Sequence, residues 1–129
     1  MTSGNDKLKR CPNCGTWFSA SDIMYSGRIE PIGMQVEDPE NPETCYFYFN
    51  DLAAYCRTTF VVPATAFTPF LQESVPEVLL LNSAGCDGHC THLDDLADCS
   101  KECRWAPYRR FLLSLIERRR QPRPARTDG

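Results

Sequence analysis

Cys11-Pro12-Asn13-Cys14-Gly15, close to the N-terminus, is the stretch of sequence on which the fold depends. Two thiols separated by two residues can converge on one metal ion, and Gly15 tolerates the positive φ that closes such a turn. A redox dithiol has the same spacing, but it is typical of a position between a strand and a helix, and no strand pattern precedes these residues. Cys11 and Cys14 are therefore predicted to bind a metal ion.

Six further cysteines raise the question of which thiols complete this site. They are Cys45, Cys56, Cys86, Cys90, Cys99 and Cys103. Eight cysteines in 129 residues indicate either disulfides in an oxidising compartment or thiolate ligands in a reducing one. Residues 1–10 contain no apolar segment typical of a signal peptide, and no run approaches the length of a membrane span. We therefore expect a soluble cytoplasmic protein with reduced, metal-binding cysteines.

The chain length indicates one domain, short enough to need stabilising cross-links. We predict an α+β fold: a small metal-stabilised domain over residues 10–120. Within it, residues 10–84 form a zinc-ribbon-like antiparallel β portion, and residues 85–120 form a Cys-rich helical portion. Residues 1–9 are expected to be a disordered lead-in, and residues 121–129 a disordered Arg/Pro tail.

The strand signals are concentrated in the first portion. Residues 45–49 are aromatic and residues 58–62 are largely β-branched, which predicts an antiparallel hairpin joined through residues 50–57. Residues 28–37 contain Pro31 and Gly33, a pattern typical of short or bent strands. Residues 78–81 are predicted to add one more buried strand.

The second portion shows helical spacing. Leu96, Cys99 and Cys103 fall on one face of a helix predicted over residues 93–103. A second helix is expected after Pro107, with the apolar stripe Phe111, Leu112, Leu115 and Ile116. Its arginines lie largely outside that stripe: Arg109, Arg110, Arg118 and Arg119.

Cys56 is the favoured third ligand because it lies in the loop of the predicted hairpin. Cys45 would lie at the opposite end of the same hairpin, too far along the strand to reach an ion bound by Cys56. Either the strand bends or Cys45 is a buried core residue, as free cysteine often is. The fourth ligand therefore stays open between Cys45 and a residue of the C-terminal cluster.

Cys86, Cys90, Cys99 and Cys103 make a C-x3-C-x8-C-x3-C array. Two pairs of thiols with helical spacing can surround a second zinc ion, so one or two zinc ions are expected in total. Disulfides and a four-thiolate iron–sulfur cluster are the alternatives. His89 and His92 flank the array, and each is interpreted as a surface histidine in preference to a ligand.

The segment at residues 11–15 resembles one knuckle of the zinc-ribbon and rubredoxin proteins. Both families use a second C-x2-C knuckle, which this chain lacks. The resemblance implies a metal-bound β portion and no particular activity.

No sequence motif indicates catalysis. The chain contains no Gly-rich phosphate loop, no G-x-S-x-G and no H-E-x-x-H. Zinc bound by thiolates alone has no open coordination position and is structural. We therefore expect a non-enzymatic, metal-binding module; an electron carrier or thiol sensor is the alternative.

Charge is divided unevenly along the chain. Residues 1–103 carry six Lys and Arg against fifteen Asp and Glu, whereas residues 104–129 carry eight Arg against two acidic residues. The Arg-rich C-terminal helix is predicted to bind a protein partner, although the same charge can simply contact the chain's own acidic body. Nucleic acid is disfavoured because that body repels phosphate.

Overall fold

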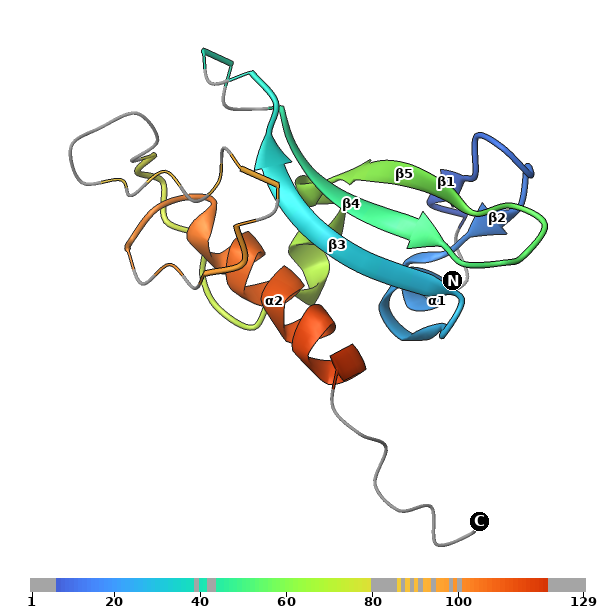
Figure 1. The fold of residues 1–129 in the computed structure, drawn as a ribbon. Coiled ribbons are helices and arrows are strands. Elements are labelled where there is room, and N and C mark those ends of the chain that lie inside the picture. Colours follow the sequence, from blue (N-terminus) through green and yellow to red (C-terminus); the bar gives the residue numbers. More distant parts are fainter. Residues whose placement is uncertain are drawn as a thin grey trace, which may run out of the picture.

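The computed structural model describes residues 7–38, 40–41, 44–79, 86, 88, 90, 92–93, 95–97, 99 and 101–120, and of Arg120 only the backbone. In order, its elements are β1 (Lys9–Arg10), β2 (Trp17–Phe18), α1 (Ala20–Tyr25), β3 (Ile29–Val36), β4 (Cys45–Asp51), β5 (Thr58–Pro63), the 3-10 helix η2 (Ala64–Phe70) and α2 (Ala106–Arg120) (Figure 1). Small antiparallel sheets followed by a C-terminal helix confirm the predicted α+β class.

β4 is the central strand of a three-stranded antiparallel sheet with the order β3-β4-β5. Its side chains alternate between the core and the outer face, and Cys45, Phe47, Phe49 and Asp51 are the buried ones. The predicted hairpin is confirmed, since Phe49 of β4 lies opposite Phe60 of β5. This alternation carries one charged residue, Asp51, to the buried face at the end of the strand.

β3 is bent, as its sequence predicted. The register of its pairing with β4 shifts between Pro31 and Gly33, where Pro31 has no N–H to donate to the ladder, and regular pairing resumes at Gly33. Gly33 is buried, and a Cβ placed there would collide with the main-chain oxygen of Leu93. The glycine therefore lets the chain around residue 93 lie directly on the sheet.

α1 begins at a capping box in which Ser19 and Asp22 satisfy each other's main-chain N–H groups. Asp22 N donates to Ser19 Oγ at 3.0 Å, and Ser19 N donates to Asp22 Oδ2 at 2.9 Å. Ser19 is therefore the N-cap of this short helix. Ile23 of α1 is buried against the end of the sheet where β3 begins.

α2 packs beside β3 and η2 (Figure 1). Its residues Leu112 and Leu115, and Trp105 just before the helix, are buried in the aromatic core. The predicted apolar stripe is confirmed, but the prediction for Arg109 is wrong, because this side chain is only 2% exposed. Its guanidinium donates to the main-chain oxygens of Ala97 and Asp95.

The helix predicted over residues 93–103 is not present in the described part of that segment. The carbonyl oxygens of Asp95 and Ala97, which a helix there would pair with its own N–H groups, accept hydrogen bonds from the Arg109 guanidinium. Asp95 also turns the chain locally, since its Oδ1 accepts from Ala97 N at 3.0 Å.

The buried strand predicted at residues 78–81 is not found in its described half, where Val78 is 57% exposed. Residues 80 and 81 lie outside the described residues. In the part of the chain that the structure describes, no helix has the length and apolar character to cross a membrane.

Candidate metal centre

The first loop of the site joins β1 to β2. Its backbone forms a tight knuckle in which Gly15 N donates to Cys11 O at 3.0 Å and Cys11 N donates to Thr16 O at 2.8 Å. Gly15 adopts φ +78°, the conformation for which glycine was expected there. The knuckle presents a buried thiol, Cys11, and a half-buried one, Cys14.

Cys56 reaches the same point from the loop between β4 and β5. Its Sγ lies 3.5 Å from Cys11 Sγ, although 45 residues separate the two in sequence. Asn13 joins the loops further, because its amide donates to Cys56 O at 3.3 Å. Stacking of Phe18 on Phe60, with ring centroids 5.6 Å apart, fixes the first loop to the sheet below. The prediction that Cys56 accompanies Cys11 and Cys14 agrees with this placement.

The fourth member of the group is Asp51, a residue that the sequence did not identify. Ligand atoms of Cys11, Cys14, Asp51 and Cys56 all lie within 4.8 Å of one another. Asp51 is fully buried, and its Oδ2 lies 3.6 Å from Cys14 Sγ. The signal available in the sequence was its place at the end of the alternating run Cys45, Phe47, Phe49, Asp51, which predicts a carboxylate on the buried face.

The spacing of these atoms fits tetrahedral coordination. With zinc–sulfur bonds of ~2.3 Å and zinc–oxygen bonds of ~2.0 Å, two sulfurs of a tetrahedron are about 3.8 Å apart and a sulfur and an oxygen about 3.5 Å apart. The observed distances are 3.5 Å for Cys11 to Cys56 and 3.6 Å for Cys14 to Asp51. The group can therefore hold a metal ion with small movements of its side chains.

Arg28 places a positive charge against this group. Its Nε and Nη2 donate to Asp51 Oδ1 and Oδ2 at 2.7 and 2.9 Å, and Nη2 lies 3.4 Å from Cys14 Sγ. The guanidinium lies between the rings of Phe18 and Tyr55, 5.2 and 5.3 Å from their centroids. The hydrogen bonds from Arg28 hold the pKa of Asp51 well below its usual range, so this buried carboxylate stays ionised.

The two thiols of the knuckle differ in acidity. Burial raises the pKa of Cys11. Hydrogen bonding to the Thr16 hydroxyl, 3.2 Å from Cys14 Sγ, and to the Thr16 main chain lowers the pKa of Cys14 to about 7. Cys14 is therefore substantially ionised at neutral pH, in the form that binds metal ions.

Cys45 does not belong to this group. It lies opposite Val36 at the other end of β4 and is buried in the core, six residues or roughly 20 Å along the strand from Asp51. The strand does not bend back to bring it to the site. Its interpretation as a core residue is the one that fits the structure.

The C-terminal thiols Cys86, Cys90, Cys99 and Cys103 lie apart from the group described above. Cys90 and Cys103 are buried, and Cys86 and Cys99 are half-buried. Burial first, and then the negative charges of the other three, raise the pKa of Cys90 to about 11. No close group of potential metal ligands among the described residues includes these four sulfurs. A second metal site at these cysteines stays a prediction.

Of the two histidines, only His92 is among the described residues. It is exposed and is not a member of the first group, whereas His89 lies outside the described residues.

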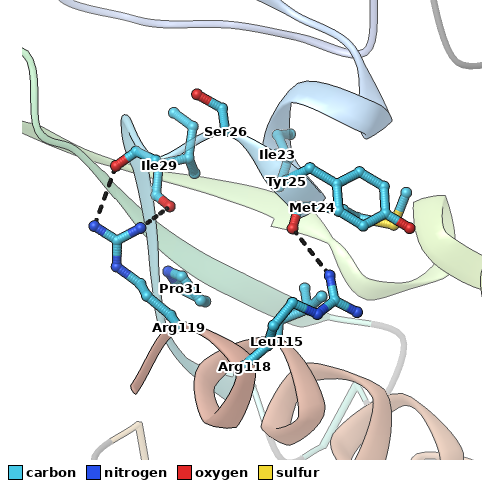
Figure 2. A pocket seen from close by; sticks show the side chains of 10 residues that line it. Ile23, Met24, Tyr25, Ser26, Ile29, Pro31, Leu115, Arg118 and Arg119 are labelled. Carbon is cyan, nitrogen blue, oxygen red and sulfur yellow. Dashed lines mark hydrogen bonds between the residues drawn. The ribbon is translucent and has the colours of Figure 1, made fainter. Parts of the chain in front are cut away.

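The described arginine side chains at the C-terminal end of α2 contact the chain itself (Figure 2). Arg118 lies over the ring of Tyr25, and Arg119 donates to Ile29 O at 3.3 Å and to Gly27 O at 3.1 Å. Together with Leu115 they border a cavity of about 510 Å³ between α1 and α2. Arg110 is likewise paired, with Glu73 at 2.7 Å. These arginines already have interaction partners within the chain, and binding of a separate partner by this helix stays a prediction.

Comparison of the chain with models of protein families, with curated proteins and with solved structures gave no match.

Proposed function

We propose that this chain is a non-catalytic zinc-binding module of the zinc-ribbon type. One zinc ion would be held by Cys11, Cys14, Cys56 and Asp51, and would join the β1–β2 loop to the β4–β5 loop. The observation that carries the proposal is the convergence of these four groups from two separate segments, residues 11–14 and 51–56, with ligand atoms within 4.8 Å of one another. Three thiolates and one carboxylate make a donor set typical of zinc.

The charges of the site support this proposal. Three thiolates and a carboxylate around Zn²⁺ leave a net charge of about −2, and the Arg28 guanidinium beside them supplies one compensating positive charge. An outer-shell cation that fixes a carboxylate ligand is common at metal sites. Asp51 Oδ2 has two lone pairs, so it can accept from Arg28 Nη2 and bind the ion as well.

A structural role follows from the closed donor set. Four protein ligands leave no position for substrate, and we infer that the centre is not catalytic. Strands of two residues, such as β1 and β2, are not stable by themselves. The ion would therefore stabilise this small domain by cross-linking the β1–β2 loop to the β4–β5 loop. Since thiolate ligands must stay reduced, the proposal also places the protein in a reducing compartment such as the cytoplasm.

Metal analysis tests the proposal. We expect the purified full-length chain to contain zinc and to melt at a lower temperature after chelation. Replacement Cys56→Ser should remove the ion of this site, whereas Cys45→Ala, a matched loss of a thiol from the core, should retain it. A brown protein containing iron and sulfide would favour the electron-carrier alternative. A metal content unaffected by Cys56→Ser would contradict the proposed site.

A further inference from the structure

The loop that carries Cys56 repeats the first knuckle in sequence and in backbone form. Residues 11–18 read CPNCGTWF and residues 53–60 read AAYCRTTF, so the two share Cys, Thr and Phe at equivalent positions. Each loop joins two antiparallel strands. The phenylalanines of the two segments, Phe18 and Phe60, stack on each other.

The main-chain hydrogen bonds of the two loops agree. Gly15 N donates to Cys11 O at 3.0 Å, and Arg57 N donates to Ala53 O at 3.0 Å. In each loop the residue directly after the shared cysteine has positive φ, which is +78° for Gly15 and +54° for Arg57. Arg57 is the one non-glycine residue with positive φ in the described part of the chain, which marks a conformation that the loop imposes against the preference of its sequence.

The two loops differ at one position that could bind a metal ion. Where the first knuckle has Cys11, the second has Ala53, which is half-buried and carries no ligand atom. The carboxylate of Asp51 lies next to this position, because Asp51 Oδ1 accepts from Ala53 N at 3.1 Å. The repeat therefore lacks a sulfur beside a carboxylate whose oxygen lies within 4.8 Å of the sulfurs of Cys11, Cys14 and Cys56.

We infer that residues 53–57 are a second metal knuckle in which Ala53 stands at the position of the first cysteine. The carboxylate of Asp51 then supplies the fourth ligand, an oxygen in place of a sulfur. The inference rests on the metal site proposed above. Its consequence is selectivity, since replacing one thiolate by a carboxylate weakens the preference for soft ions such as Cd²⁺ relative to Zn²⁺. The variant Ala53→Cys should therefore create a four-thiolate site.

Cobalt substitution of the full-length chain tests this inference. The cobalt–thiolate charge-transfer band grows with the number of sulfurs bound, and Ala53→Cys should raise it by about one third, as for four sulfurs instead of three. The matched control is Ala54→Cys, which adds a thiol at the next, exposed residue and should leave the band unchanged. Ala53→Cys should also raise the affinity for Cd²⁺ relative to Zn²⁺, and it leaves the Arg28–Asp51 pair intact.

A second variant pair gives an independent readout. Asp51→Asn should weaken cobalt binding about 10–100-fold, and Ala53→Cys added to it should restore the binding. Equal bands for Ala53→Cys and Ala54→Cys, with wild-type cobalt binding present, would overturn the inference and leave the proposed metal site standing. Absence of a cobalt–thiolate band in the wild type would overturn both.

Discussion

Both oxygens of the buried Asp51 carboxylate accept hydrogen bonds from Arg28, at 2.7 and 2.9 Å, and the same guanidinium touches the sulfur of Cys14. Asp51 is thus connected to the Cys11–Cys14 knuckle through Arg28. The Arg28 guanidinium compensates the negative charge of Asp51 and fixes the position of this carboxylate at the end of β4. The consequences for stability can be measured directly.

Replacement of Arg28 by Gln should destabilise the metal-free protein by about 2 kcal/mol at neutral pH, because it leaves a buried carboxylate without its partner. The folded-state pKa of Asp51 is lowered, so the stabilisation is present above the ordinary carboxyl pKa of ~3.9 and is lost as the pH falls through the folded value. Urea unfolding in chelator, from neutral pH down to about pH 3, measures the difference between wild type and variant.

The double variant Arg28→Gln/Asp51→Asn is the control for this experiment. Removing the carboxylate should recover most of the lost stability, since no buried charge is then unpaired. A variant equally destabilised at every pH would show that Arg28 acts through its packing between Phe18 and Tyr55 and not through its charge.

Alkylation of the metal-free chain should modify Cys14 well before Cys90. Cys14 is half-buried with a pKa of about 7, so its rate should rise through that pH and then level off. Cys90 is buried with a pKa of about 11, and its rate should still be rising well above neutral pH. Mass spectrometry of the labelled peptides gives both rates.

Two controls separate acidity from accessibility in this labelling. Thr16→Val should raise the pKa of Cys14 and move its rate profile to higher pH, because Thr16 makes the largest contribution to the shift. Zinc added before the reagent should protect Cys14. Fast labelling of Cys14 in the presence of zinc would argue against its role as a ligand.

Gly33→Ala should destabilise the protein by about 2 kcal/mol, because the added methyl group collides with the main chain at Leu93. Gly27→Ala is the matched control: a Cβ there meets no atom within 4 Å, and the change should stay within about 0.5 kcal/mol. Thermal unfolding of the two variants measures the difference. A tolerated Gly33→Ala would show that residues around Leu93 do not lie on the sheet in solution.

A second metal site predicts a stoichiometry of two ions per chain. The double variant Cys86→Ser/Cys99→Ser should reduce it by one, and we choose these two thiols because they are half-buried and their replacement costs little packing. Metal analysis after gel filtration gives the count. An unchanged count would assign all bound metal to the first centre and leave the C-terminal cysteines as core or free thiols.

The parts of the fold that local sequence pattern controls could be predicted, whereas those that depend on long-range partners could not. The hairpin of β4 and β5, the bend at Gly33 and the knuckle at Cys11 each follow from residue types within a few positions. Asp51 was missed because a single acidic residue at a strand end has no spacing that identifies it as a ligand. In the described part of residues 93–103 the chain is not helical, and it contacts Arg109, a residue outside that segment whose position the local pattern does not reveal.

The brevity of β1 and β2 has a consequence for how the molecule assembles. A pair of two-residue strands is too small to persist alone, and the contact between Cys11 and Cys56 closes a loop of 45 residues. The β4–β5 hairpin, by contrast, forms from neighbours in the chain. We therefore expect the N-terminal hairpin to dock last. If the proposed ion holds it there, removal of the ion should release residues 7–18 while the sheet and α2 stay folded.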